Sequence, residues 1–218
     1  MKGDIVLVEV RHQIAAVIIV SKLIDKIKNC RTRFIISVAG ESGSGKSETA
    51  KAIADELKKY GVKSVVLGQD DYFHLPPKSN DAKRREDPEW LGPHVEVNLD
   101  ALESNLIDAV KGKAEITKPL VDYQNNSIEQ ETINLNGVEV VIAEGTYASL
   151  LKNVDIRIFI ARNRLDTLEH RVKRNRGNEV NDPFIEQVLT TEHKIIAGHI
   201  QLADFVITKN YDVIDRNS

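Results

Sequence analysis

The sequence has little of several residue types that mark specialised protein classes. A single cysteine, Cys30, among 218 residues excludes a disulfide framework within the chain and favours a reducing compartment. Aromatic residues make up only 5%, which argues against a stacking surface for single-stranded nucleic acid. The 30 Lys and Arg nearly balance the 33 Asp and Glu, so nothing attracts the chain generally to nucleic acid or to anionic membranes. What is left is an ordinary globular chain of one domain, or of one domain with a small appendage.

Long hydrophobic runs are also missing. The most apolar run, residues 14–20, is far shorter than the about 20 residues of a membrane-spanning helix, and its flanks do not fit a signal peptide. We expect a strand over Ile5–Val10 and a helix over 12–28, which together form an N-terminal extension (1–30) to a main domain (31–218). Near-helical spacing predicts one buried face on this helix, made of Ile14, Val17, Ile18, Ser21, Ile24 and Ile27.

From Phe34 onward, strand-like and helix-like segments alternate, which is typical of a doubly wound α/β domain around a parallel sheet. Asn136-Gly137 predicts a hairpin turn between the strands on either side, and four of the six prolines predict an irregular excursion over 74–98. The predicted strands are Phe34–Ala39, Val62–Gly68, Thr132–Leu135, Val138–Ala143, Asp155–Ile160 and Phe205–Thr208. The predicted helices are 46–60, Leu99–Lys111, Leu165–Asn175 and Asp182–Leu202.

The segment after the first of these strands carries the chemistry. Gly40-Glu41-Ser42-Gly43-Ser44-Gly45-Lys46-Ser47 matches the pattern G-x-x-x-x-G-K-[ST] and stands between a buried strand and an amphipathic helix. Glycines let successive backbone N–H groups turn inward around a phosphate, and the positive end of the following helix points at the same place. Lys46 adds a full charge for the β- and γ-phosphates, and the Ser47 hydroxyl is a ligand for Mg²⁺. The motif therefore predicts a nucleotide-phosphate site.

Acidic residues follow two of the predicted strands. A helix of about 14 residues after Lys46 and the strand that returns from it cover similar distances, so Asp70 and Asp71 are expected beside the phosphate loop. The same reasoning brings Glu144 to this edge, where open α/β sheets bind ligands. Asp71 also suits a turn or cap without a direct role. The sequence predicts carboxylates around a magnesium–triphosphate.

A basic cluster, residues 170–177, follows the next strand. Arg171 and Arg174 lie three residues apart and share one face of a helix. They either offset the dipole at the end of that helix or form a lid, around 170–182, that closes over the transferred phosphoryl group. We favour the lid.

The class of protein follows from these parts. A guanine-nucleotide switch is disfavoured because Asp212 falls one place late for the base-reading motif at 208–212. The chain from Phe34 to about Asn210 resembles the uridine kinase/phosphoribulokinase family of P-loop kinases, which implies a nucleoside-kinase-like, three-layer α/β/α fold. The segments that carry the resemblance are GESGSGKS (40–47), GQDDYF (68–73), PLVDY (119–123), VVIAEG (140–145), HRVKRNRG (170–177) and ADFVITKN (203–210).

The resemblance implies a reaction and the parts that perform it. The γ-phosphoryl group of ATP would pass to a hydroxyl of a small molecule, with Asp70 as the base and Glu144 near Mg²⁺. Lys46, Arg171 and Arg174 would neutralise the charge on the phosphoryl group. ATP and Mg²⁺ are the expected cofactors, the cytoplasm is the expected location, and neither nucleic acid nor a membrane is an expected partner. A homo-oligomer stays open, as does the alternative of a regulatory protein that binds nucleotide without turnover.

The residues expected to contact the acceptor depart from those of the nucleoside-specific members of the family. Nucleoside-specific members of the family have a tyrosine and a histidine where this chain has Val121 and Asn126. A site that loses such hydrogen-bonding groups loses much of its discrimination, so a sugar alcohol, a sugar phosphate or a small hydroxy acid becomes a candidate beside a nucleoside. The residues expected near the acceptor are Asp71, Tyr72, Trp90, His94, Asp122, Tyr123 and Arg176.

Overall fold

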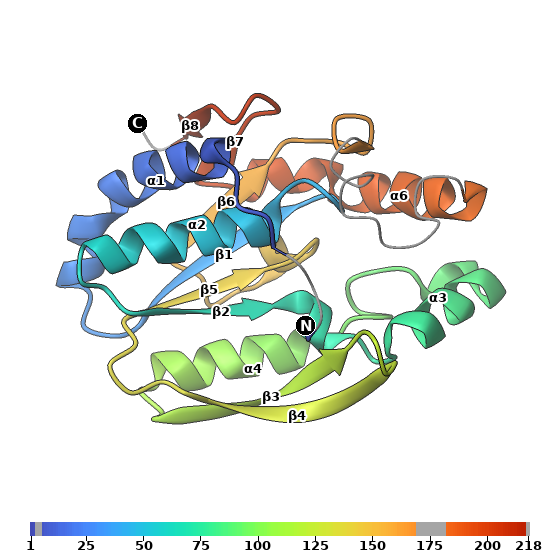
Figure 1. The fold of residues 1–218 in the computed structure, drawn as a ribbon, viewed down its shortest axis with the longest axis horizontal. Helices are drawn as coiled ribbons and strands as arrows, with labels where there is room; N and C mark the ends of the chain where they lie inside the picture. Colours follow the sequence, from blue (N-terminus) through green and yellow to red (C-terminus); the bar gives the residue numbers. More distant parts are fainter. Residues whose placement is uncertain (3–5, 169–181, 217–218) are drawn as a thin grey trace.

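A central, mostly parallel sheet organises the protein (Figure 1). The computed structural model describes residues 1–2, 6–168 and 182–216. Within these ranges the main sheet has the strand order β2-β5-β1-β6-β7-β8, and only β8 runs antiparallel to its neighbour. Its strands are β1 (Phe34–Gly40), β2 (Ser64–Gly68), β5 (Val140–Glu144), β6 (Ile156–Ile160), β7 (Phe205–Ile207) and β8 (Val213–Asp215). Because later strands flank β1 on both sides, the predicted doubly wound α/β fold is confirmed.

Helices cover both faces of this sheet and make three layers (Figure 1). The α-helices in the described part of the chain are α1 (Val10–Asn29), α2 (Lys46–Lys59), α3 (Pro77–Glu86), α4 (Leu99–Val110) and α6 (Pro183–Ile196). Alternate residues of β1 point to opposite faces, so Ile36 and Val38 pack with α1 and α2, whereas Ile35 packs with α4. Cover on both faces explains why every residue of β1 is buried.

A second sheet lies outside α4 and corrects one prediction (Figure 1). It consists of β3 (Glu115–Asp122) and β4 (Ser127–Asn134), paired antiparallel. The turn at Asn136-Gly137 joins β4 to β5, but these strands belong to different sheets, so the predicted hairpin is wrong. The reason is the pattern of each strand, because β5 is apolar on both faces and suits the covered sheet. β4 alternates with polar residues and pairs with β3, which the sequence analysis missed.

Helix α1 differs from its prediction in its start and in its buried face. Residues 6–9 form no strand, and α1 begins at Val10, where the backbone N–H of Glu9 donates to Nδ1 of His12 at 2.9 Å. The side of α1 that carries Ala15 packs on α2, whereas Ile14 is 55% and Val17 43% exposed. Small side chains let α1 lie close to α2, which favours that side. The buried residues of α1 are His12, Ala15, Ala16, Ile19, Val20, Leu23 and Ile27.

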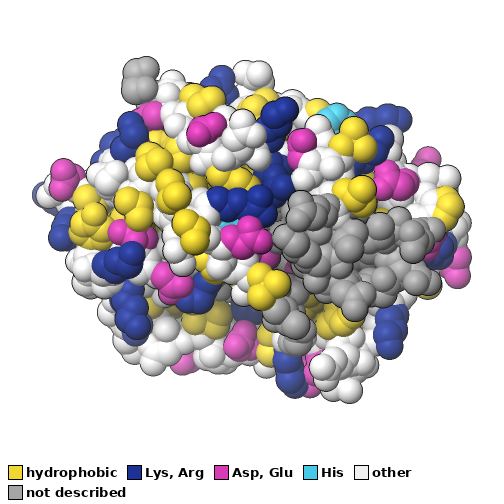
Figure 2. Space-filling view, turned by 45° about the horizontal axis from the view of Figure 1, so that its top comes forward, with side chains coloured by type: hydrophobic (Ala, Val, Ile, Leu, Met, Phe, Trp, Pro, Cys, Tyr) yellow, Lys and Arg dark blue, Asp and Glu magenta, His cyan; other side chains and the backbone are white. Residues whose placement is uncertain are grey.

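The outer face of α1 therefore carries hydrophobic side chains among charged ones, which Figure 2 shows on its left. Among the described residues, no helix combines the length and the hydropathy that crossing a bilayer requires.

Other boundaries differ in smaller ways. The excursion at 74–98 contains α3, which Pro77 opens at the first helical position. The predicted helix over 182–202 consists of α6 and a 3₁₀ segment, Ala197–Leu202. Residues 164–167 form a turn, and most of the predicted helix over 165–175 lies outside the described residues.

Candidate active site

The phosphate-binding motif forms a loop between β1 and α2. Gly45, with φ of +98°, immediately precedes α2, and Nζ of Lys46 donates to the carbonyl of Glu41 at 3.0 Å. The lysine is thus folded across the loop. The Glu41 carboxylate is anchored to α6, because its Oε1 lies 2.6 Å from Nδ1 of His193. Because the backbone N–H groups of the first turn and the positive end of α2 lie beside it, the loop over 40–47 can hold an anion.

Two carboxylates stand at the same edge of the sheet. Gly68 and Glu144 are register partners in β2 and β5, and Asp70 follows two residues later. The Ser47 hydroxyl donates to Oε1 of Glu144 at 3.1 Å, so helix α2 and strand β5 meet here. Burial and the neighbouring charge of Asp70 raise the pKa of Glu144 to about 7, although Lys46 and the Ser47 hydrogen bond oppose this. The edge concentrates negative charge beside the loop, which suits a metal-bound nucleotide.

A side chain that the sequence analysis missed locks the two strand ends together. Gln69 is buried, and its Oε1 accepts the backbone N–H of Tyr147 at 2.8 Å. A Cβ on Gly145 would lie 2.2 Å from Cβ of Gln69, so only glycine fits beneath it. Gln69 precedes Asp70, and Gly145 follows Glu144, so this contact fixes the two carboxylates relative to each other. A signal in the sequence was available: Gln69-Asp70 and Glu144-Gly145 stand at the ends of two predicted strands, which parallel pairing brings side by side.

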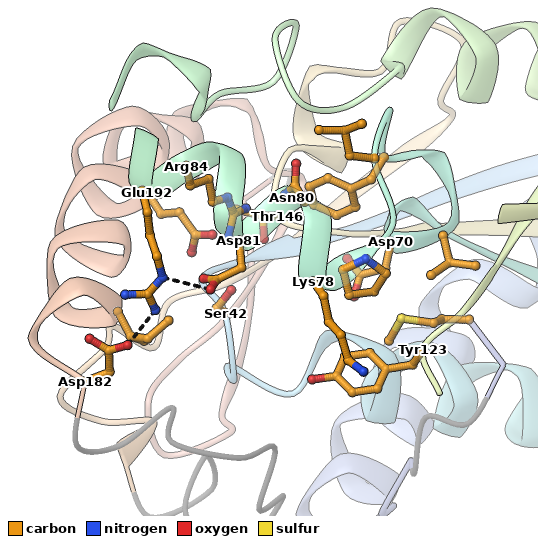
Figure 3. Close-up of a pocket in the computed structure, with 17 residues that line it drawn as sticks. Ser42, Asp70, Lys78, Asn80, Asp81, Arg84, Tyr123, Thr146, Asp182 and Glu192 are labelled. Carbon is orange, nitrogen blue, oxygen red and sulfur yellow. Dashed lines mark hydrogen bonds and ion pairs between the residues drawn. The ribbon is translucent and has the colours of Figure 1, made fainter. Parts of the chain in front are cut away.

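A cavity of about 510 Å³ opens beside the loop (Figure 3). Ser42 of the phosphate loop and Asp70 both line it, as do Thr146 and Tyr123. This volume lies within the usual range of small-molecule sites. A compound in the cavity would therefore lie between the predicted base and the phosphate loop.

Helix α3 supplies cavity residues that the sequence analysis did not identify. Nε of Arg84 lies 2.6 Å from Oε2 of the buried Glu96. Arg85 bridges α3 to the start of α6, with Nη2 2.6 Å from Oδ2 of Asp182 (Figure 3). Burial raises the pKa of Glu192, a third cavity residue, although Arg84 opposes this. Arg84 and Arg85 were missed because 74–98 was expected to be irregular, although Pro77 before a charged run is a helix-start signal. Glu192 lies on α6, within a predicted helix, and no local pattern singled it out.

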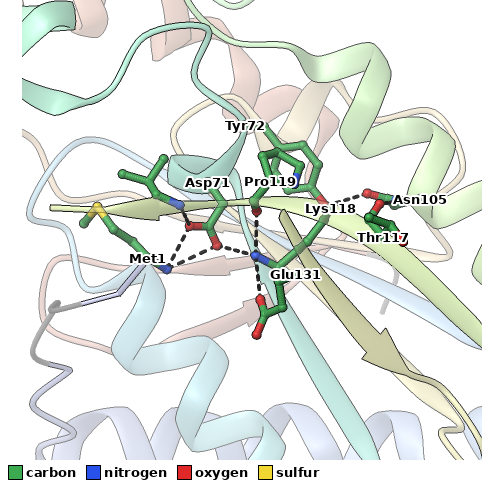
Figure 4. Close-up of polar contacts among 9 residues, drawn as sticks. Met1, Asp71, Tyr72, Asn105, Thr117, Lys118, Pro119 and Glu131 are labelled. Atoms are coloured by element: carbon green, nitrogen blue, oxygen red, sulfur yellow. Dashed lines mark hydrogen bonds and ion pairs between the residues drawn. The ribbon is translucent and has the colours of Figure 1, made fainter. Parts of the chain in front are cut away.

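Asp71 points away from the cavity into a buried ion cluster (Figure 4). Its Oδ2 lies 2.6 Å from Nζ of Lys118, and each side chain is 4% exposed. Its Oδ1 accepts the backbone N–H of Val121 at 3.0 Å, and the amino group of Met1 lies 3.1 Å away. Asp71 therefore ties β3 to the end of β2, and its expected place near the acceptor is not what the structure shows.

The other residues expected near the acceptor differ in whether they line the cavity. Tyr123 lines the cavity. Tyr72 is buried, and its hydroxyl donates to Oδ1 of Asn105 at 2.8 Å; burial raises its pKa. Trp90 donates from Nε1 to Asn80, and His94 is exposed away from the cavity lining. Only Tyr123 among these is placed to touch an acceptor.

Asp122 and the arginines of the predicted lid are the remaining predicted site residues. The carboxylate of Asp122 accepts from Asn125, and Lys2 lies 3.1 Å away, and these contacts lower its pKa to about 2. It serves the turn between β3 and β4. Arg171, Arg174 and Arg176 lie outside the described residues, so the lid stays a prediction.

Comparison with known proteins gives these features a family. A bifunctional α-galactosidase/sucrose kinase from Mediterraneibacter gnavus is 29% identical over 86% of this chain, and the match spans 21% of that longer protein. A uridine kinase from Ureaplasma parvum is 31% identical over 74% of this chain and 77% of its own. A putative fructose transport system kinase from Silicibacter shares the fold, with a TM-score of 0.62 and 16% identity over 86% of this chain and 93% of its own.

The family model for the Phosphoribulokinase / Uridine kinase family matches residues 35–209. These residues include the phosphate loop, Asp70 and Glu144, and they extend past β7, the last parallel strand of the main sheet. The chain therefore belongs to the Phosphoribulokinase / Uridine kinase family, a family of small-molecule kinases.

Proposed function

We propose that the protein transfers the γ-phosphoryl group of ATP to a hydroxyl of a neutral saccharide in the cytoplasm. The observation that carries this proposal is the cavity that Asp70 and Ser42 line together. An acceptor there would lie between a carboxylate and the phosphate-binding loop. Because phosphoryl transfer has a loose transition state, its catalysis depends mostly on such positioning and on charge stabilisation.

The phosphate loop would bind the nucleotide. Backbone N–H groups over 40–47 would hold the phosphates, and Lys46 would leave the carbonyl of Glu41 to neutralise charge on the γ-phosphoryl group. Ser47 and Glu144 fit Mg²⁺, because their hydroxyl and carboxylate oxygens already meet and this ion prefers oxygen ligands. When bound, the ion would neutralise charge across the β- and γ-phosphates.

Asp70 is assigned the general base. Its carboxylate reaches the cavity from the end of β2, where Gln69 holds the backbone in place. There it would orient the acceptor hydroxyl and take its proton as the bond to phosphorus forms.

The side chains at positions 121 and 126 offer a pyrimidine base no hydrogen bond in the cavity. Asn126 does not line the cavity, because its Oδ1 accepts the backbone N–H of Lys78 and its Nδ2 donates to Ser79. Val121, which does line it, has an apolar side chain without a hydrogen-bonding group. A base would find no polar partner at either position.

The charges favour a neutral acceptor over a sugar phosphate. Among the described cavity residues, Arg84 is paired with Glu96 and Arg85 with Asp81 and Asp182. The amino group of Met1 is paired with Asp71, so the exposed Lys78 remains as the cation at the edge. Carboxylates and Tyr123 instead offer hydrogen bonds to hydroxyl groups. The sucrose kinase named among the relatives supports the same class.

An acceptor panel tests this function. We expect neutral mono- or disaccharides to stimulate ADP release from MgATP above the rate without acceptor, and the product to gain one phosphoryl group by mass spectrometry. Sugar phosphates, hydroxy acids and nucleosides should stimulate less. Uridine or cytidine as the best acceptor would overturn the saccharide assignment. MgATP binding without stimulation by any compound would favour the regulatory alternative.

A further inference from the structure

A buried polar cluster packs against the phosphate loop, and its side chains are not among the described residues that line the cavity. It comprises His12 of α1, Arg162 after β6, Tyr211 after β7, and the backbone of Ser44 in the loop; we call it the Tyr211 cluster. His12 is 0%, Tyr211 5% and Arg162 7% exposed. These residues come from segments far apart in the sequence, and the family motifs used above do not include His12 or Tyr211. The cluster is also where the N-terminal helix reaches the loop.

The hydrogen bonds of the Tyr211 hydroxyl converge on one carbonyl. Nδ1 of His12 accepts from the backbone of Glu9, so the proton of the neutral ring lies on Nε2, which donates to the Tyr211 hydroxyl at 3.0 Å. Nη1 of Arg162 donates to the same hydroxyl at 2.8 Å. With both acceptor positions filled, the hydroxyl donates its own proton to the carbonyl of Ser44 at 3.4 Å. Burial raises the pKa of Tyr211, which keeps this proton in place.

Arg162 strengthens the hold on that carbonyl. The same Nη1 lies 3.4 Å from the Ser44 oxygen, and Nη2 donates to the carbonyl of Asp166 at 2.8 Å. The guanidinium also lies 5.1 Å from the centre of the Tyr211 ring. Two donors from separate segments therefore point at the Ser44 oxygen.

Packing leaves the loop no room to move toward the cluster. A Cβ on Gly45 would lie 2.8 Å from the Tyr211 hydroxyl and 2.9 Å from Nε2 of His12. The His12 and Tyr211 rings meet edge to face, with centroids 4.9 Å apart. The cluster thus sits directly against the residue that precedes Lys46.

We propose that the Tyr211 hydroxyl, held by His12 and Arg162, is a positioning group that orients the Ser44–Gly45 peptide of the phosphate loop for nucleotide binding. In a trans peptide, the carbonyl and the following N–H point in opposite directions. Holding the Ser44 oxygen toward Tyr211 therefore aims the N–H of Gly45 away from the cluster, to the side where the phosphates would bind. The inference rests on the loop binding nucleotide, as in the proposed function, and makes α1 a part of that site.

The test is Tyr211→Phe, read as the affinity for MgATP by titration calorimetry, which needs no knowledge of the acceptor. Phenylalanine keeps the ring but removes the hydroxyl that links His12 to the Ser44 oxygen. We expect the dissociation constant for MgATP to rise about tenfold, while the KM for the acceptor and the kcat at saturating MgATP change less than twofold.

Two matched variants separate orientation from general destabilisation. His12→Leu should weaken MgATP binding as Tyr211→Phe does, and His12→Gln, whose amide can still donate to the hydroxyl, should recover most of the affinity. Ile19→Val removes a buried methyl group from the same helix without touching the loop. It should lower the melting temperature and leave MgATP affinity unchanged.

These measurements separate a failure of the positioning role from a failure of the proposed function. Wild-type protein that fails to bind MgATP would contradict the proposed function. Wild-type binding together with unchanged affinity in Tyr211→Phe would overturn the positioning role alone. Equal loss of affinity in Ile19→Val and Tyr211→Phe would overturn it as well, because general stability would then explain both.

Discussion

Replacing Lys46 by alanine is expected to lower kcat by at least about 10³-fold. Lys46 is the first residue of α2, and its side chain folds over the phosphate loop to the carbonyl of Glu41, 3.0 Å away. From there its ammonium group is in reach of phosphates held by the loop. Removing one preorganised donor from a developing negative charge typically costs about 10²–10³-fold, and Lys46 carries a full charge besides. Steady-state ADP release at saturating MgATP and acceptor measures the effect.

Lys51→Ala provides the matched control. Lys51 lies on the same helix five residues further along, but it is exposed and pairs with the exposed Asp55 four residues later. Such surface pairs contribute little, so this variant should keep wild-type kcat. More than a tenth of the wild-type kcat in Lys46→Ala would contradict the role of the loop.

Asp70→Asn is expected to reduce kcat by about 10²–10⁴-fold, the usual contribution of a general base. The amide has nearly the same shape as the carboxylate but cannot take a proton from the acceptor. Because Asp70 lines the cavity and makes no part of the phosphate loop, the affinity for MgATP should stay within about threefold of wild type. Single-turnover kinetics and titration calorimetry separate the two quantities. Full turnover with normal MgATP affinity would remove Asp70 from catalysis.

The neighbouring Asp71→Asn should give the opposite result. Asp71 and Lys118 form a buried pair at 2.6 Å, and removal of one partner would leave the other charge buried. We expect the free energy of unfolding to fall by about 3 kcal/mol, while folded protein keeps a kcat near wild type. Urea denaturation and activity of the folded fraction check both statements. If Asp71→Asn lowered kcat as much as Asp70→Asn does, the result would contradict a purely structural role for Asp71.

The main sheet, and the carboxyl edge that carries the phosphate loop and two carboxylates, could be predicted because they depend on local sequence patterns. The mostly apolar runs at β1 and β5 indicate strands covered on both faces, and the glycine-rich motif after β1 indicates the phosphate loop. Chain geometry then brings Asp70 and Glu144 to the loop, and the register of β2 and β5 places them there.

The remaining features depend on contacts between distant segments. Which of Asp70 and Asp71 faces the cavity is decided by Lys118, a partner 47 positions later, and no local pattern shows this. Helix α1 is apolar on two sides, so its periodicity did not select the side with Ala15, which fits α2. The role of Tyr211 likewise appears only when α1 and β6 are brought against the loop.

A crystal structure with Mg²⁺, a non-hydrolysable ATP analogue and the saccharide that the panel identifies tests the central claim most directly. The account predicts the triphosphate against the backbone N–H groups of residues 40–47. It also predicts a saccharide hydroxyl within about 3 Å of the Asp70 carboxylate, in reach of the γ-phosphate. Phosphates bound away from this loop, or a saccharide whose hydroxyl groups lie out of reach of Asp70, would contradict it.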